Sequence, residues 1–192
     1  MENKNEFKSL IFCDVDGVLN HDLFYEEQYK HLHKNDGIPL YKVVKKYLRK
    51  LLKSQEISTI DYYKSQIDLS KIKLLNDLCV KTNSVVVLSA SMRNQWDVQD
   101  LQVIFKKLGA TFTIIDKTGN CECRNRGCEI KKWLTNNVEE YFDASSHNFY
   151  HYAIIDDGID FLLNQREHFF HVDSYFGLTQ KICNEVEKFL NI

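Results

Sequence analysis

The sequence predicts an α/β fold that is built on a mainly parallel sheet of five strands. The first observation is that short apolar runs alternate along the chain with segments in which apolar residues recur at helical spacing. The second is that these runs are apolar throughout, which is typical of strands that helices cover on both faces. The five runs are Leu10–Cys13, Val85–Leu88, Phe112–Ile115, Tyr152–Ile155 and Phe169–Val172.

Each expected strand is followed by a polar residue, which is an aspartate after four of the five. The expected helices fill the gaps between the strands, and their ends carry ordinary capping residues. The helical patterns span Ile72–Cys79, Val98–Leu108, Ile130–Leu134 and Ile182–Leu190. Ser70 is the expected N-cap of the first, Asp97 and Gly109 flank the second, and the third follows Gly127.

One segment, from residue 20 to about residue 68, interrupts this alternation directly after the first strand. We expect a single domain over residues 1–192, in which this segment forms a small helical cap-type insertion. Its clearest pattern is an amphipathic helix over Leu40–Leu52, started by Pro39. The basic run Lys42–Lys53 on that helix is interpreted as a solvated face in preference to a nucleic-acid contact. The histidines expected on the solvated surface of the insertion are His21, His31 and His33.

Composition excludes several classes of protein. The 25 basic and 27 acidic residues leave a formal net charge of -2, which gives no global electrostatic case for nucleic acid or an acidic membrane. No apolar run approaches the roughly 20 residues that span a bilayer, and the first nine residues do not resemble a secretory signal. We therefore expect a cytoplasmic protein without a membrane partner; the oligomeric state is not predicted.

The six cysteines are expected to be reduced. Three of them lie in apolar or helical patterns, where a thiol behaves as a small hydrophobic group. The other three, Cys121, Cys123 and Cys128, resemble part of a thiolate metal site. No fourth ligand is evident, and His147 and His151 are candidates only because they are near enough along the chain to reach it. Loop thiols are the favoured interpretation.

Polar residues should meet where the expected strands end. The pairs Asp14/Asp16 and Asp156/Asp157 follow two of the strands, and Ser89 follows a third. In open α/β sheets, ligands bind beyond the carboxyl ends of the strands. Carboxylates brought together there favour a hard cation such as Mg²⁺, since only oxygen ligands are on offer.

These motifs resemble those of the haloacid dehalogenase (HAD) superfamily. Phe12–Asn20 resembles its motif I, Val87–Ser89 its motif II, and Ile154–Asp157 its motif IV. A narrower similarity is to HAD domains associated with RNA-repair proteins. It rests on the patterns D-x-D-G-V-L-N, S-x-S-x-R, R-G-x-E-I-x-x-W-L, I-D-D and V-D-x-x-x-G-L-T. The resemblance implies a Rossmannoid three-layer sandwich with a small helical cap.

The resemblance also implies roles for individual residues. Asp14 matches the nucleophile that forms an aspartyl-phosphate, and Asp16 matches the acid/base. Ser89 matches the hydroxyl that binds the transferring phosphoryl group. The implied Mg²⁺ ligands are Asp14, the backbone carbonyl of Asp16, and Asp156, with Asp157 holding a metal-bound water or orienting the loop; Asp160 is an alternative to Asp157.

The basic groups of the site are less firmly indicated. Arg126 is the favoured counterpart of the superfamily's cationic motif III, because it precedes Gly127 at a helix start; Lys131 is second and Lys132 third. Lys131 is also a candidate for substrate binding. Arg93 could bind a substrate phosphate, or could instead pair with a neighbouring acid.

The sequence thus predicts a Mg²⁺-dependent phosphomonoester hydrolase that acts through an aspartyl-phosphate. The expected substrate is a nucleotide or sugar phosphate, or a nucleic-acid end. Two alternatives stay open. One is a 3′-phosphatase or end-processing domain for RNA or DNA, and the other is a HAD fold that binds without catalysis.

Overall fold

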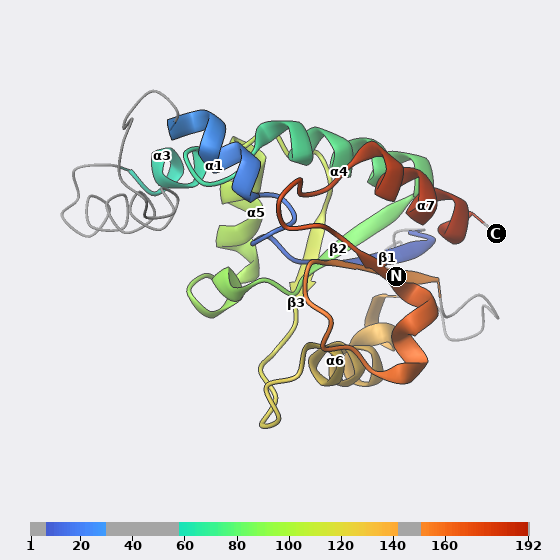
Figure 1. Ribbon diagram of the computed structural model, residues 1–192. Coiled ribbons are helices and arrows are strands. Elements are labelled where there is room, and N and C mark those ends of the chain that lie inside the picture. The colour runs from blue at the N-terminus through green and yellow to red at the C-terminus, as the bar shows by residue number, and fades with distance from the viewer. Residues whose placement is uncertain (1–6, 30–57, 142–150, 192) are drawn as a thin grey trace.

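The computed structural model describes residues 7–29, 58–141 and 151–191 (Figure 1). Its centre is one sheet of five strands, ordered β3-β2-β1-β4-β5 and parallel throughout. The fold class predicted from the apolar runs is therefore confirmed. The strands are β1 (Ser9–Cys13), β2 (Ser84–Leu88), β3 (Ile114–Lys117), β4 (Tyr152–Asp156) and β5 (Phe169–His171).

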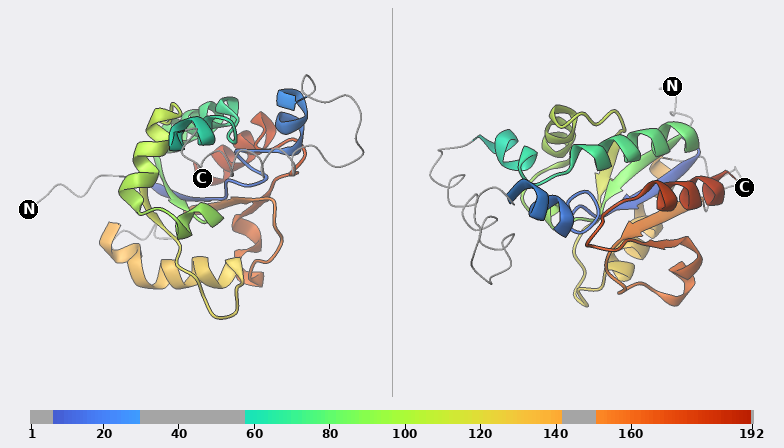
Figure 2. Two further views of the ribbon diagram at one scale, coloured as in Figure 1. Left: turned by 90° about the vertical axis from the view of Figure 1, so that its left-hand side faces the viewer. Right: turned by 45° about the horizontal axis from the view of Figure 1, so that its top comes forward.

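Helices cover both faces of the sheet, as the views in Figures 1 and 2 show. α4, α5 and α7 lie on one face, and α6 lies on the other. The helices are α1 (Asp22–Tyr29), α3 (Thr59–Lys64), α4 (Leu69–Thr82), α5 (Val98–Lys107), α6 (Arg126–Tyr141) and α7 (Gln180–Leu190), with short 3₁₀ helices at Ser91–Asn94 and Leu163–His168.

The alternation of side chains along β1 divides the core in two. Ile11 and Cys13 point to the face of α4, α5 and α7, while Leu10 and Phe12 pack against α6. Both sets are buried, which explains why the strand is apolar at every position rather than at every second one. On the α6 face, the Phe12 ring meets Trp133 edge to face at 5.4 Å between centroids.

Several predicted element boundaries differ from the structure, most clearly those of β3, α4 and α6. β3 begins at Ile114 rather than Phe112, because its pairing with β2 starts only at Ile114, opposite Val86; a bulge then places Asp116, not Ile115, opposite Val87. α4 begins at Leu69, and its N-cap is Asp68 rather than Ser70; the Asp68 side chain accepts a hydrogen bond from the Ser70 amide. α6 begins at Arg126 and is longer than the short helix expected there.

The insertion is described only at its two ends, by α1 and α3. The helix expected over Leu40–Leu52, the basic run on it, His31 and His33 lie outside the described residues, as does His147. The solvated position predicted for His21 is wrong. Its ring is buried, with Nε2 3.0 Å from Asp68 Oδ2 and Nδ1 3.1 Å from the Tyr175 carbonyl oxygen. Burial raises the pKa of Asp68, but the hydrogen bonds from His21 and Ser70 outweigh it and lower that pKa overall.

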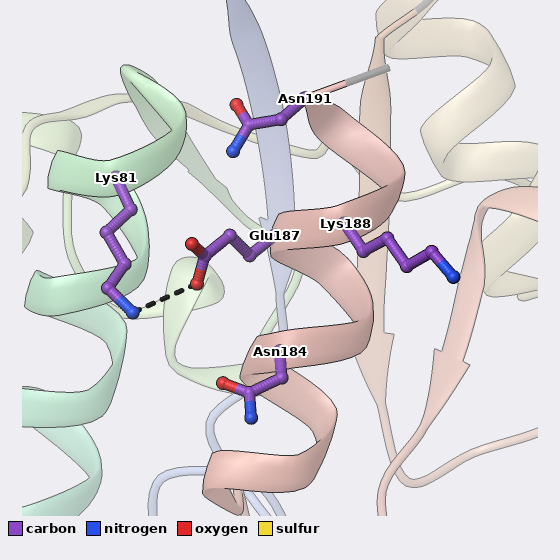
Figure 3. A pocket seen from close by; sticks show the side chains of 5 residues that line it. All are labelled: Lys81, Asn184, Glu187, Lys188 and Asn191. Atoms are coloured by element: carbon purple, nitrogen blue, oxygen red, sulfur yellow. Dashed lines mark hydrogen bonds and ion pairs between the residues drawn. The ribbon is translucent and has the colours of Figure 1, made fainter.

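A polar hollow lies between α4 and α7 (Figure 3). Lys81, in the last turn of α4, lines it, and α4 leads into the start of β2, so the hollow lies toward the edge of the sheet opposite to the strand ends. Lys81 Nζ reaches Glu187 Oε2 there at 3.0 Å and links the two helices. Because the lysine is largely exposed, this ion pair contributes little to stability. The packing of the helices on the sheet therefore rests on their apolar faces.

The loop after β5 yields a stability prediction. Gly177 has a φ of +65°, and a Cβ placed on it would lie 2.8 Å from both His21 Cδ2 and the Val18 carbonyl oxygen. Gly109 has a φ of +92° but open space around it. Gly109→Ala should therefore lower the free energy of unfolding by about 1–2 kcal/mol, the cost of the left-handed backbone alone. Gly177→Ala should lose about 1–3 kcal/mol more through crowding. Urea unfolding of both variants tests this, and equal losses would contradict it.

Candidate active site

The parallel register brings three sequence-distant residues together at the carboxyl edge of the sheet. Cys13 on β1 pairs with Leu88 on β2 and with Ile155 on β4. The residues that follow these three in the sequence are Asp14, Ser89 and Asp156, and they therefore lie side by side. Backbone hydrogen bonds extend the pairing, because the Ser89 amide donates to the Cys13 carbonyl and the Asp14 amide to that of Ile155, both at 3.0 Å. All three side chains are buried.

Three carboxylates form a compact acidic group at this edge. One oxygen from each of Asp14, Asp156 and Asp157 lies within 4.8 Å of the others. Gly17 makes room for this approach, because a Cβ on it would lie 2.2 Å from Asp157 Oδ2. Its φ of +79° also belongs to the left-handed region that glycine tolerates. The turn in motif I is thus shaped by the need to admit the third carboxylate.

Burial makes ionisation of this group costly. It raises the pKa of Asp14 to about 7, with a further contribution from the charge of Asp156. Burial likewise raises the pKa of Asp156 and of Asp157. Asp156 Oδ2 is buried and accepts no hydrogen bond from the described residues. A hard cation would satisfy that oxygen and let the carboxylates ionise together, so the donor set fits a divalent ion such as Mg²⁺.

Arg126 supplies the positive charge that faces these carboxylates. One guanidinium nitrogen lies 3.5 Å from Asp14 Oδ2 and the other 3.3 Å from Asp156 Oδ2. The guanidinium also donates to the carbonyl of Ser89, so it joins the ends of β1, β2 and β4. Its coulombic effect lowers the pKa of both aspartates against the effect of burial.

The other two motif III candidates lie elsewhere. Lys131 and Lys132 are exposed on α6, one turn or more beyond Arg126. Asp160, the alternative to Asp157, holds the start of that helix: its Oδ2 accepts from the Arg126 amide at 2.9 Å and its carbonyl accepts from the Gly127 amide. Asp157, not Asp160, joins the acidic group.

Asp16 is held by two donors. Asn20 Nδ2 donates to its Oδ1 at 2.9 Å, and Ser91 Oγ donates to its Oδ2 at 3.0 Å. Ser89 behaves differently, because its buried Oγ has no hydrogen-bond partner within the described part of the chain. A buried hydroxyl without a partner is costly, so this oxygen is available to a ligand at the site.

Arg93 is buried rather than open to a substrate. Its NH2 donates to Glu129 Oε2 at 2.6 Å and to Asn120 Oδ1 at 3.2 Å, while NH1 donates to the carbonyls of Ala90 and Ser89. Both members of the Arg93–Glu129 pair are less than a tenth exposed. Of the two interpretations of Arg93, the structure therefore contains the ion pair with an acid.

Sequence reasoning missed four residues of the site: Asn20, Ser91, Asn120 and Glu129. Three of them stand inside the motifs that carry the HAD resemblance, at the N of D-x-D-G-V-L-N, the second S of S-x-S-x-R and the E of R-G-x-E. Their partners are 4 to 75 positions away, which no spacing rule reveals. The pattern could thus have marked them but not assigned them.

Within the described ranges, the cysteines form no metal site. Among the described residues, the acidic group is the one cluster of three or more histidine, cysteine or acidic side chains placed to hold an ion. Cys13, Cys79 and Cys183 are buried free thiols, as their apolar surroundings predict. The sulfurs of Cys121 and Cys123 lie 3.1 Å apart in the loop before α6.

Comparison with known proteins agrees with this geometry. No curated protein and no solved structure matches the chain. None of the helices in the described ranges is long and apolar enough to cross a membrane. Residues 10–183, which include every strand-end residue of the site, match the family of the HAD domain in Swiss Army Knife RNA repair proteins, and the chain therefore belongs to that family.

Proposed function

We propose that this domain hydrolyses phosphomonoesters in a Mg²⁺-dependent reaction that passes through an aspartyl-phosphate on Asp14. The observation that carries the proposal is the meeting of three different groups at one sheet edge. They are the acidic group of Asp14, Asp156 and Asp157, which is placed to hold a cation, the guanidinium of Arg126, and the Ser89 hydroxyl, which has no hydrogen-bond partner among the described residues. Phosphoryl transfer needs this combination of positioning and charge neutralisation.

The metal would be held by Asp14, Asp156 and Asp157, with the backbone carbonyl of Asp16 as the further ligand that the HAD resemblance implies. When bound, Mg²⁺ would neutralise part of the negative charge on the phosphoryl oxygens. Arg126 would bind a second phosphoryl oxygen, since its guanidinium already faces Asp14 and Asp156. Ser89 Oγ would donate to a third.

The reaction then divides into two steps. In the first, Asp14 attacks phosphorus, the bond to the ester oxygen breaks, and Asp16 gives its proton to the leaving alcohol. In the second, Asp16 takes a proton from water, whose oxygen attacks the aspartyl-phosphate and releases inorganic phosphate. Asn20 and Ser91 would keep Asp16 facing the substrate through both steps, because each holds one of its oxygens.

For the substrate, we propose the phosphorylated end of an RNA strand. Support comes from the family description, which places such HAD domains in RNA repair proteins. The test is hydrolysis of a panel of phosphomonoesters, including 3′- and 5′-phosphorylated oligonucleotides, nucleotides and sugar phosphates, with Mg²⁺ and with EDTA. Release of phosphate from no member of the panel would favour the non-catalytic alternative. Release from metabolites alone would retain the chemistry and reject the RNA end.

The nucleophile gives the first prediction on activity. Asp14→Asn should reduce turnover by about 10⁴-fold or more, because the amide cannot form the phosphoenzyme. The folded state should persist, since the shape of the side chain is kept and one unfavourable buried charge is removed. Asp100→Asn, at an exposed position in the first turn of α5, is the matched control and should retain full activity. Phosphate release and circular dichroism measure the two effects, and an active Asp14→Asn protein would refute the mechanism.

Asp16, the proposed acid/base, gives the second prediction on activity. Asp16→Asn should slow hydrolysis of an alkyl phosphate by about 10²–10⁴-fold, because the departing alkoxide then lacks a proton donor. With an aryl phosphate, whose leaving group is acidic, the same substitution should reduce the rate of enzyme phosphorylation much less. Single-turnover rates on the two substrates measure the difference. Equal losses would assign Asp16 to metal binding or folding instead.

The raised pKa of Asp14 gives a prediction on how stability depends on pH. The folded protein keeps a proton on Asp14 up to about pH 7, whereas the unfolded chain releases it near the ordinary value of 3.8. Between these values the folded state binds more protons, so its stability should fall as pH rises through that window. The melting temperature in EDTA should therefore drop from pH 5 to pH 8, and less so in Asp14→Asn.

The ionisation of Asp14 should also make the stabilisation by Mg²⁺ depend on pH. Mg²⁺ should raise the melting temperature strongly at pH 8 and little at pH 5, because the cation binds ionised carboxylates. Ca²⁺ or Mn²⁺ can replace Mg²⁺ in this measurement, which needs no turnover. A Mg²⁺ effect that is equal at both pH values would show that the ion binds elsewhere.

A further inference from the structure

The loop between β3 and α6 holds two thiols in contact. Cys121 Sγ and Cys123 Sγ lie 3.1 Å apart, with Cys123 exposed and Cys121 partly so. A β-turn brings them together, closed by the Arg124 amide that donates to the Cys121 carbonyl at 3.1 Å. A disulfide has an S–S distance of about 2.05 Å, so the sulfurs need to approach by only about 1 Å to bond.

Three of the four remaining cysteines are poorly placed to compete. Burial raises the pKa of Cys79 to about 12 and that of Cys183 to about 11, and it raises the pKa of Cys13 as well. Because the thiolate is the reactive form and these three sulfurs are also buried, they should be inert. The contact with Cys123 raises the pKa of Cys121 as well, so the exposed Cys123 is the thiol expected to react first. Cys128 lies in the first turn of α6, where its amide donates to Asn125 Oδ1.

The same turn is tied to the proposed catalytic groups. Cys121 Sγ donates to the Asn125 carbonyl at 3.4 Å, and the Asn125 side chain caps the start of α6 through the Cys128 amide at 2.9 Å. The residue after Asn125 is Arg126, whose guanidinium faces Asp14 and Asp156. A movement of the Cys121 sulfur would therefore disturb the start of α6.

We propose that Cys121 and Cys123 are a site of reversible oxidation to a disulfide, with a peroxide as the oxidant. The exposed Cys123 thiolate attacks one oxygen of hydrogen peroxide, the O–O bond breaks, and water leaves with the proton it takes up. Cys121 then attacks the sulfur of the resulting sulfenic acid, the S–O bond breaks, and the oxygen leaves as a second water with the proton from Cys121. Two thiols and one peroxide thus give one disulfide and two waters.

The bond should be easy to reduce again. Only one residue separates the two cysteines, and the turn is exposed, two features of labile disulfides. Reduction by a dithiol such as dithiothreitol returns both thiols by exchange. Oxidation would remove the hydrogen bond from Cys121 to Asn125 and loosen the first turn of α6.

The experiment treats the whole chain with hydrogen peroxide, unfolds it, counts free thiols and maps the disulfide by mass spectrometry. The count should fall from the six of the sequence to four, and return to six with dithiothreitol. Cys123→Ser should abolish the disulfide, whereas Cys128→Ser, the matched control at the helix start, should form it as the wild type does. A disulfide that includes Cys128, a bond between two chains, or an unchanged count would overturn the proposal.

Coupling to the site is measured without any substrate. Hydrogen exchange at the amides of Gly127 and Cys128, which donate to Asp160 and Asn125, should quicken several-fold in the oxidised form and slow again after reduction. Cys123→Ser treated with peroxide should show no such change. Identical exchange in the oxidised and reduced wild type would overturn the coupling. None of these readouts depends on phosphatase activity, so failure here and failure of the proposed hydrolysis are separable.

Discussion

The structure depends on how buried carboxylates are compensated at one edge of the sheet. Asp14 and Asp156 follow adjacent strands and are almost fully buried, which favours their protonated forms. A single guanidinium, that of Arg126, faces both. Removing such a counter-charge from a buried site costs several kcal/mol, about 3–5 in typical cases. The placement of α6 is therefore as much an electrostatic requirement as a packing one.

Several local features follow from that requirement. The start of α6 is fixed by Asp160, which accepts from the backbone amides of Arg126 and Gly127. One turn further, Glu129 pairs with Arg93 from the loop after β2. Arg93 and Arg126 both donate to the carbonyl of Ser89, so two cations from different elements hold the end of one strand. The buried Arg93–Glu129 pair gives this loop one position relative to α6, which apolar packing alone would specify less sharply.

The sheet and the strand-end residues could be predicted because they depend on local patterns. Continuous apolar runs mark doubly covered strands, and parallel strands end at the same edge, so Asp14, Ser89 and Asp156 were expected to meet. Pairings between distant segments could not be predicted in this way. His21 is buried because Asp68 and Tyr175 enclose it from 47 and 154 positions away, and Arg93 finds Glu129 36 positions on. The start of β3 was misplaced because an apolar run does not show at which of its residues the pairing with the neighbouring strand begins, and here that residue is Ile114.

What the site lacks is as informative as what it contains. Ser89 Oγ and Asp156 Oδ2 are buried without a hydrogen-bond partner in the described ranges, next to a guanidinium and two further carboxylates. The unpartnered Ser89 hydroxyl costs the protein stability, on the order of 1–3 kcal/mol, whereas the ion pair with Arg126 at 3.3 Å compensates part of the cost of burying Asp156 Oδ2. An alanine in place of Ser89 would avoid the cost of the buried hydroxyl. It would keep the backbone hydrogen bond from the amide of residue 89 to the Cys13 carbonyl. A fold that kept this edge for packing alone would need neither the unpartnered hydroxyl nor the buried carboxylate oxygen that Arg126 has to compensate. Their placement beside a cluster suited to a cation is instead what a site for an anion and its metal requires, where the ligand supplies the missing partners.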